Sequence, residues 1–163
     1  MRTGNQMRRS LLVLSPYPTG HVPGQRFRIE QWEGVLADAG IDCTYIPFAD
    51  PGLMRILFKP GHTLAKGYGV VRGALRQSRA LKRLSTVDVA LVFRAASLAG
   101  PPILERSLAR RGIPFILDFD DAIFVLHSTR ANRWFSWLKF PGKTRALCQM
   151  SSHVTVGNAY LKD

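Results

Sequence analysis

The chain has 163 residues, 46% of them hydrophobic and 21% charged, which is enough for one buried core and predicts a single domain over residues 1–163. Lysine and arginine total 23 against 11 acidic residues, and this net charge of +12 predicts anionic partners. The longest apolar runs are too short for a membrane-spanning helix or a signal peptide, so a cytoplasmic protein is expected. Two separated cysteines and four scattered histidines indicate neither a disulfide framework nor a metal site, and no metal is assigned.

Apolar runs along the chain predict five strands, at residues 11–15, 43–48, 87–93, 114–117 and 153–156. Helical spacing predicts helices between them, at 27–39, 70–84, 101–111 and around 134–150, the last broken near 141–142. The second of these helices is expected to carry its apolar residues on one side and its basic residues on the other, the first side consisting of Val71, Ala74, Leu75, Ser78 and Leu81. Strands that are apolar throughout suit a sheet buried on both faces, so the fold class is α/β, a Rossmann-like doubly wound, mostly parallel sheet with helices on both faces.

The fourth predicted strand runs directly into three carboxylates, Asp118, Asp120 and Asp121. Carboxylates are costly to desolvate, so they must meet donors, a cation or water at the edge of the sheet where ligands of α/β folds bind. A solvated turn in which Asp121 caps a short helix is the alternative. The Asp-x-Asp pattern also fits a haloacid-dehalogenase-like phosphatase, whose first carboxylate attacks phosphorus. Only one further acid, Asp163, follows in the last 42 residues, which disfavours that reaction.

The segment after the first strand places Gly24 and Gln25 before two arginines, Arg26 and Arg28, at the expected start of a helix. Backbone N–H groups and the helix dipole attract phosphate at such a place, and arginines add bidentate contacts. The alternative is that these arginines are surface charges or pair with nearby glutamates. No glycine-rich dinucleotide motif follows the strand, so no cofactor is expected.

Residues 51–87 contain no acid, and basic residues alternate there with leucine, phenylalanine, tyrosine and valine. Such a mixture suits contact with an anionic membrane surface. Nucleic acid is supported only by charge, because no recognition motif is present, and a solvated basic helix is the third possibility. The residues proposed for membrane contact are Arg55, Lys59, Lys66, Arg72, Arg76, Arg79, Lys82 and Arg83.

Several short patterns recur in a consistent order over nearly the whole chain. They are Gln25-Arg26-Phe27-Arg28 leading to Trp32, residues 36–41, residues 88–94, Glu105, Asp118-Phe119-Asp120-Asp121-Ala122-Ile123, Lys143, and residues 154–161. In this order and spacing the chain resembles the amino-terminal domain of family 4 glycosyltransferases, enzymes with two Rossmann-like domains in the GT-B architecture.

The resemblance implies transfer of a sugar from a nucleotide-sugar donor to a glycan, lipid-linked or small-molecule acceptor, as in polysaccharide or cell-envelope biosynthesis. It implies no metal and no cofactor beyond the nucleotide sugar as co-substrate. By this likeness Arg94 and the three aspartates line the cleft between the domains. The likeness also implies that the loop of Gly24, Gln25, Arg26 and Arg28 faces the donor phosphates or the acceptor. It assigns no residue as catalytic.

By the same resemblance the chain ends where the donor-binding domain would begin, so it is expected to need a carboxyl-terminal domain or a separate subunit for activity. The basic segment would then hold the protein at the inner face of the cell membrane. The competing hypothesis is a non-catalytic Rossmann-like binding or scaffold module whose basic face attaches to membrane or protein.

Overall fold

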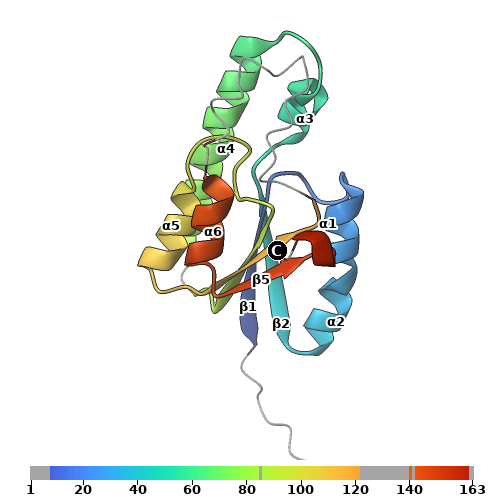
Figure 1. Cartoon of the computed structure of the whole chain (residues 1–163), viewed down its shortest axis with the longest axis vertical. Coiled ribbons are helices and arrows are strands. Elements are labelled where there is room, and N and C mark those ends of the chain that lie inside the picture. The colour runs from blue at the N-terminus through green and yellow to red at the C-terminus, as the bar shows by residue number, and fades with distance from the viewer. Residues whose placement is uncertain (1–7, 85, 122–139, 141, 162–163) are drawn as a thin grey trace, which may run out of the picture.

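The computed structural model describes residues 8–84, 86–121, 140 and 142–161 (Figure 1). In this part of the chain five strands form one all-parallel sheet in the order β2-β1-β3-β4-β5. The strands are β1 (Arg9–Ser15), β2 (Ile41–Pro47), β3 (Val89–Phe93), β4 (Phe115–Phe119) and β5 (His153–Val156). The helices are α1 (Pro23–Arg28), η1 (Glu30–Trp32), α2 (Glu33–Asp38), α3 (Pro51–Leu57), α4 (Thr63–Arg83), α5 (Ile103–Arg110), α6 (Lys143–Met150) and η3 (Ala159–Leu161).

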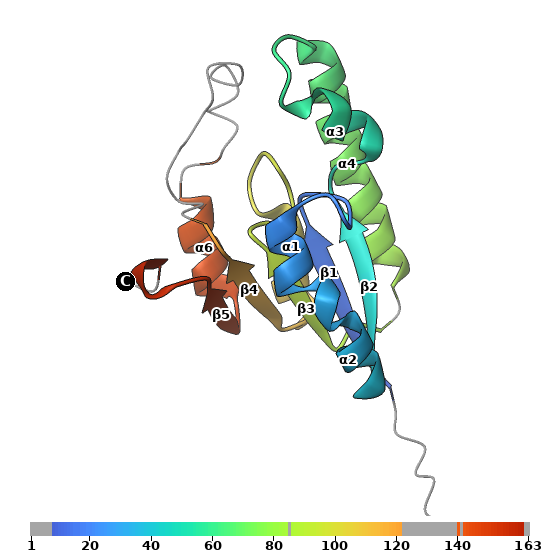
Figure 2. The ribbon, with the colours of Figure 1, turned by 90° about the vertical axis from the view of Figure 1, so that its right-hand side faces the viewer.

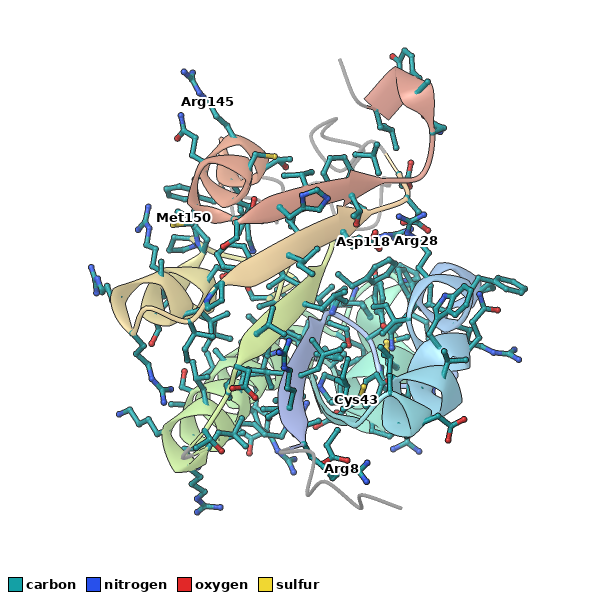
Figure 3. The ribbon with its side chains drawn as sticks, turned by 90° about the horizontal axis from the view of Figure 1, so that it is seen from below. Arg8, Arg28, Cys43, Asp118, Arg145 and Met150 are labelled. Atoms are coloured by element: carbon teal, nitrogen blue, oxygen red, sulfur yellow. The ribbon has the colours of Figure 1, made fainter. Side chains whose placement is uncertain are left out.

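Helices cover both faces of the sheet, with α1 and α2 on one face and α4, α5 and α6 on the other (Figure 3). Side chains of β1 alternate between the two layers: Leu12 and Leu14 join the core under α4 to α6, whereas Leu11 and Val13 join the smaller core with Ile29. Both faces are buried in the centre of the sheet, and there Leu11 to Leu14 of β1 and the whole of β3 are apolar, whereas the edge strands β2 and β5 also carry polar residues. The predicted α/β class with a parallel sheet is confirmed.

The α3–α4 hairpin extends past the carboxyl-terminal edge of the sheet (Figures 1 and 2). Helix α4 has 21 residues, so at 1.5 Å per residue it is about 31 Å long. A separate apolar cluster of Phe48, Ala49 and Leu53 joins the hairpin to the end of β2. One half of α4 therefore covers the sheet, and the other half stands beyond it.

The single helix predicted over residues 27–39 is wrong. The chain forms α1, η1 and α2 there, and Ile29 interrupts the helix with φ −132° and ψ −59°. Helix α1 begins earlier than expected, at Pro23, a residue that suits the first helical position. Two apolar residues of this segment, Trp32 and Val35, are 51% and 61% exposed.

Helix α4 begins before the predicted residue 70, and it turns a different face to the sheet than its apolar pattern predicts. Leu81 is buried as expected, but Val71 and Leu75 are 59% and 49% exposed. The other buried positions of the helix are Lys66, Gly73 and Gln77. The apolar side that the sequence predicts for this helix is therefore not the side that packs on the sheet.

The physical reason for this rotation is a set of backbone carbonyls at the carboxyl end of the sheet. The buried amide of Gln77 donates from Nε2 to the carbonyl oxygens of Ile46 at 3.0 Å and Ala96 at 2.9 Å. At Gly73 an added Cβ would lie 2.6 Å from the Phe48 carbonyl oxygen. The close approach of α4 to the Phe48 backbone and the hydrogen bonds from Gln77 to the two carbonyls thus decide which side of the helix is buried, and the larger apolar side chains remain outside.

The remaining predicted elements agree with α5, α6 and β5 to within two residues at most boundaries. Strand β4 continues to Phe119, so Asp118 belongs to the strand rather than to the turn that follows it. The predicted helical chain at residues 134–138, and the short helix that Asp121 would cap, lie outside the described residues.

The amino-terminal cap of α3 yields a first testable prediction. The Asp50 carboxylate accepts from the Leu53 backbone N–H at 2.8 Å. This hydrogen bond lowers the pKa of Asp50 below its ordinary value of 3.8, and the charges of Arg76 and Arg72 add to the lowering. We expect Asp50→Ala to lower the free energy of unfolding by about 1 kcal/mol at neutral pH.

Because the pKa of Asp50 is lowered in the folded chain, the stability it confers is present above pH 3.8 and is lost as the pH falls through the folded-state pKa. Urea unfolding at pH 7 and pH 3 measures this loss. Asp50→Asn, which keeps the capping oxygen without the charge, is expected to lie between wild type and Asp50→Ala at pH 7. Equal midpoints for all three proteins would contradict the capping role.

Candidate functional site

The candidate site lies at the carboxyl-terminal edge of the sheet where β1 and β3 are neighbours. The connection from β1 to β2 passes over one face through α1 and α2, and the connection from β2 to β3 passes over the other through α3 and α4. In open parallel sheets such a reversal of strand order leaves a crevice between the diverging loops, and ligands bind there.

Arg94 follows β3 directly at this position and has a left-handed backbone with φ 60°. Its backbone N–H donates to the Asp118 carbonyl at 2.7 Å, and its Nε donates to Asp120 Oδ1 at 2.8 Å. The guanidinium also lies 5.3 Å from the centre of the Phe93 ring. A left-handed conformation costs free energy for any residue other than glycine, and such strain concentrates at functional positions. The fold therefore fixes Arg94 firmly at the switch point.

Asp120 lies so close to the backbone of Gly24 and of Gly157 that neither position has room for a side chain. A Cβ on Gly24 would lie 2.1 Å from Asp120 Oδ2, and a Cβ on Gly157 would lie 3.0 Å from Asp120 Cα. Gly24 was expected to be a flexible loop residue. Instead it lies inside α1, where the absence of a side chain lets the helix approach the carboxylate.

Asp118 is buried and neutralised by Arg28 of α1, a residue 90 positions away in sequence (Figure 3). Arg28 Nε donates to Asp118 Oδ2 at 2.7 Å, and its Nη2 donates to Oδ1, which also accepts from Thr155 Oγ1 of β5. The hydrogen bond to Asp118 is the main reason that the pKa of Arg28 is raised. This pair ties α1, β4 and β5 together.

The first half of α1 does not form the open phosphate loop that the sequence suggested. Gln25 is fully buried, and its Nε2 donates to Glu30 Oε1 at 2.8 Å. Glu30 in turn accepts from the Gly20 backbone N–H, so these residues fasten the loop after β1. Pro23 offers no N–H at the helix start, and the helix has only six residues. Of the predicted loop residues, Arg26 is the exposed cation.

The hydrogen bonds that Asp118 accepts disfavour the phosphatase alternative. A phosphoryl-accepting carboxylate must present a free oxygen to the substrate, but both Asp118 oxygens accept hydrogen bonds and the residue is 4% exposed. The second aspartate of the pattern, Asp120, is occupied by Arg94. Asp121 is exposed at the same edge. The geometry thus gives Asp118 a structural role, whereas Asp120 is paired with Arg94 through its Oδ1 atom.

A second polar cluster supports the loop that follows β3. Lys143, at the start of α6, donates from Nζ to the Ser97 carbonyl at 2.9 Å and to its Oγ at 2.8 Å. Burial lowers the pKa of Lys143, and the charge of Glu105 opposes this lowering. Glu105 is itself fully buried, and its Oε1 accepts from the Ala96 backbone N–H at 2.9 Å. These contacts hold the loop just beyond Arg94 in place.

The side chains at the edge form a set suited to binding hydroxyl groups. Burial raises the pKa of Tyr17, although the nearby Arg94 charge lowers it in part, so the phenol is a hydrogen-bond donor at neutral pH. Arg94 donates as well, while Asp120 and Asp121 accept. Among the described residues, no three histidine, cysteine, aspartate or glutamate side chains come together to hold a metal.

The basic segment predicted for membrane contact is only partly a surface. Lys66 is buried, and its Nζ donates to the Lys59 carbonyl at 2.5 Å, so its assignment to a membrane-contacting face is wrong. Arg76 is partly buried and donates to the carbonyls of Pro47 and Phe48 at the end of β2. The exposed members are Arg55, Lys59, Arg72, Arg79, Lys82 and Arg83. No helix in the described ranges combines the length and apolar character that a membrane span requires.

Several residues of the site carried no signal in the sequence. Tyr17, Ser97 and Thr155 are ordinary residues in their local segments, and only the pairing of strands and loops brings them to the site. Thr155, for example, lies beside Asp118 because β4 and β5 pair in parallel with that register. A signal could have been found for Gly157, since a glycine directly after a predicted strand permits a close approach.

Comparison of the chain with protein-family models, with curated proteins and with solved structures returned no match. Its function is therefore argued from the geometry of the carboxyl-terminal edge and from the surface of α4.

Proposed function

We propose that this chain is the acceptor-side half of a glycosyltransferase that moves a sugar from a nucleotide-sugar donor to a glycan, lipid-linked or small-molecule acceptor. The supporting observation is convergence: Arg28, Arg94 and Asp120, separated by up to 92 positions in sequence, meet at one edge of the sheet. These residues belong to the patterns that carry the resemblance to family 4 glycosyltransferases.

In the proposed role the edge binds acceptor hydroxyl groups. Asp120 and Asp121 accept hydrogen bonds from hydroxyls, and Arg94 and Tyr17 donate to their oxygens. The Arg94–Asp120 pair is only partly exposed, with side chains 24% and 23% accessible, so its polar groups are held in place before a ligand arrives. The donor diphosphate needs cationic stabilisation as it leaves, and a donor-binding domain facing this edge supplies it.

The proposal predicts that Asp120→Asn lowers sugar transfer about 10- to 100-fold, because a charged acceptor of a hydroxyl hydrogen bond is lost. The chain is co-expressed with the donor-binding half encoded by the same or an adjacent reading frame. Release of nucleoside diphosphate is then measured from UDP-glucose, UDP-N-acetylglucosamine and GDP-mannose, with membranes of the producing cells as the acceptor source. The chain alone is expected to release none.

Asp42→Asn is the matched control, because Asp42 is an exposed aspartate paired with Arg8 near the opposite end of the sheet. Its turnover is expected to equal that of wild type. Unfolding midpoints of both variants separate a loss of binding from a loss of folding. Diphosphate release that is absent for every donor, or equal in Asp120→Asn and wild type, would refute the proposal and favour the non-catalytic binding module.

A further inference from the structure

Helix α4 carries an exposed apolar stripe on the side opposite the sheet. Leu64, Tyr68, Val71 and Leu75 follow one another at i, i+4, i+7 and i+11, so they lie on one line along the helix. Their exposed fractions are 90%, 69%, 59% and 49%. The buried positions of the same helix, among them Gly73, lie on the other side. Large apolar side chains are rarely left in such a continuous exposed row.

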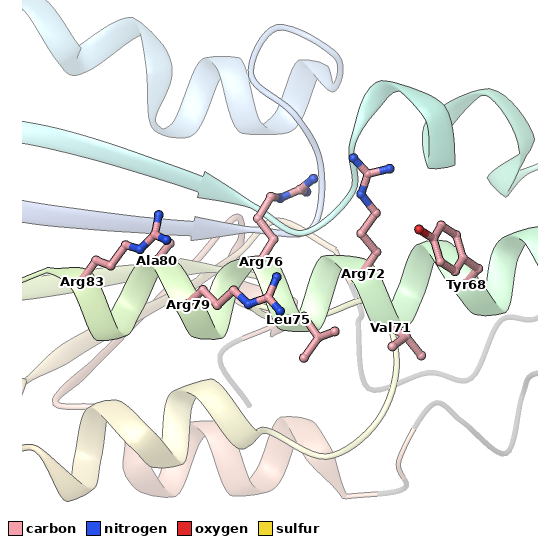
Figure 4. Close-up of a pocket in the computed structure, with 8 residues that line it drawn as sticks. All are labelled: Tyr68, Val71, Arg72, Leu75, Arg76, Arg79, Ala80 and Arg83. Carbon is pink, nitrogen blue, oxygen red and sulfur yellow. The ribbon is translucent and has the colours of Figure 1, made fainter.

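Arginines flank this stripe and form a groove with it (Figure 4). The groove has a volume of about 550 Å³, and its walls include Tyr68, Val71 and Leu75 with Arg72 and Arg79, all from α4. Further along, Arg83 extends the same flank. No salt bridge formed within the described ranges involves Arg79 or Arg83. Their charge is therefore available to a ligand outside the chain.

The surroundings of the groove are uniformly cationic. The chain from residue 51 to residue 87 carries eight basic residues and no acid. Of the two carboxylates that border this segment, Asp50 is engaged by the Leu53 N–H and by Arg76, and Asp88 accepts from the Ser10 N–H. A protein partner would need an acidic surface that also buries a hydrophobic row. An anionic bilayer offers phosphate charge at its surface and hydrocarbon directly beneath, in the same order as the arginines and the apolar stripe.

We propose that the exposed face of α4, defined by Leu64, Tyr68, Val71, Leu75, Arg79 and Arg83, binds the surface of a membrane that contains anionic phospholipid. The helix lies along the interface, the stripe enters the headgroup region, and the arginines contact lipid phosphates. The α3–α4 hairpin projects past the carboxyl-terminal edge of the sheet, so part of this face extends beyond the body of the domain (Figure 2). The membrane contact is independent of any glycosyl transfer.

Vesicle flotation tests the proposal with the full chain. Binding to phosphatidylglycerol–phosphatidylcholine vesicles is expected to exceed binding to pure phosphatidylcholine and to fall with rising salt. Arg79→Gln/Arg83→Gln is expected to weaken binding about 30-fold, since each cation near an anionic surface raises the affinity about fivefold. Val71→Ser/Leu75→Ser removes exposed side chains and is expected to weaken binding about tenfold at unchanged charge.

Two control variants make the same types of substitution at exposed positions outside α4. Arg106→Gln/Arg110→Gln removes two exposed charges from α5, and Val35→Ser/Ile103→Ser removes two exposed apolar side chains. Both are expected to bind vesicles as wild type does. The proposal would be overturned if the control variants weakened binding as much as the α4 variants, or if wild type bound neutral vesicles equally well. It would also be overturned if the chain bound no vesicles and light scattering showed a dimer that Val71→Ser/Leu75→Ser dissociates.

Discussion

Arg28→Met is expected to lower the free energy of unfolding by about 3 kcal/mol, because it leaves the buried Asp118 carboxylate without its cation. Removing one partner of a buried pair typically costs about 3–5 kcal/mol, and the lower end applies here since the Arg28 side chain is 25% exposed. The substitution is expected to weaken the contacts between three elements, because Asp118 joins α1, β4 and β5 through Arg28 and Thr155.

The measurement is urea unfolding of Arg28→Met beside Arg26→Met, its neighbour on the same helix. Arg26 is exposed, so its loss is expected to change stability by no more than about 0.5 kcal/mol. Arg28→Met/Asp118→Asn is expected to be more stable than Arg28→Met, because the uncompensated charge is gone. Equal stability of the two single variants would show that the ion pair contributes little to the fold.

Gly73→Ala is expected to destabilise the protein by about 1–3 kcal/mol, whereas Gly67→Ala in the same helix is expected to stabilise it by about 1 kcal/mol. At Gly73 the new Cβ would lie 2.6 Å from the Phe48 carbonyl oxygen, a backbone atom that cannot move without shifting the end of β2. At Gly67 no atom of the described residues lies within 4 Å of the added carbon, so only the helix-favouring effect of alanine remains.

The two alanine variants are compared by urea unfolding at neutral pH, and each is the control for the other because the chemical change is identical. A clear difference of sign is the expected result. Stabilisation by both substitutions would mean that α4 does not approach β2 as closely as the structure shows. The rotation of α4 that exposes Val71 and Leu75 would then need revision as well.

The inference about the membrane depends on that same rotation. If α4 faced the sheet as its apolar pattern suggested, Val71 and Leu75 would be buried and the groove beside Arg79 would lose its apolar wall. Because Gly73 and Gln77 occupy the buried side instead, the larger apolar residues are left outside among arginines. The requirement for close packing at one face of the helix thus creates the candidate binding surface at the other.

The class of fold could be predicted from the amino-acid sequence alone. Strands buried on both faces must be apolar along their length, so runs such as residues 11–15 and 89–93 are visible without any knowledge of their partners. The net charge and the acid-free segment 51–87 are likewise properties of composition. The carboxylates after the fourth strand could be expected at the carboxyl-terminal edge, because parallel strands end there together.

Which residues contact one another depends on the packing of elements that are far apart in the sequence. Arg28 neutralises Asp118 across 90 positions, and Thr155 joins them through strand register, neither of which leaves a local pattern. The buried face of α4 likewise depends on the carbonyls of Ile46 and Ala96, which accept hydrogen bonds from the Gln77 amide. Local periodicity reports how apolar a segment is, whereas burial of a particular side chain depends on the donors, acceptors and backbone that the fold places opposite it.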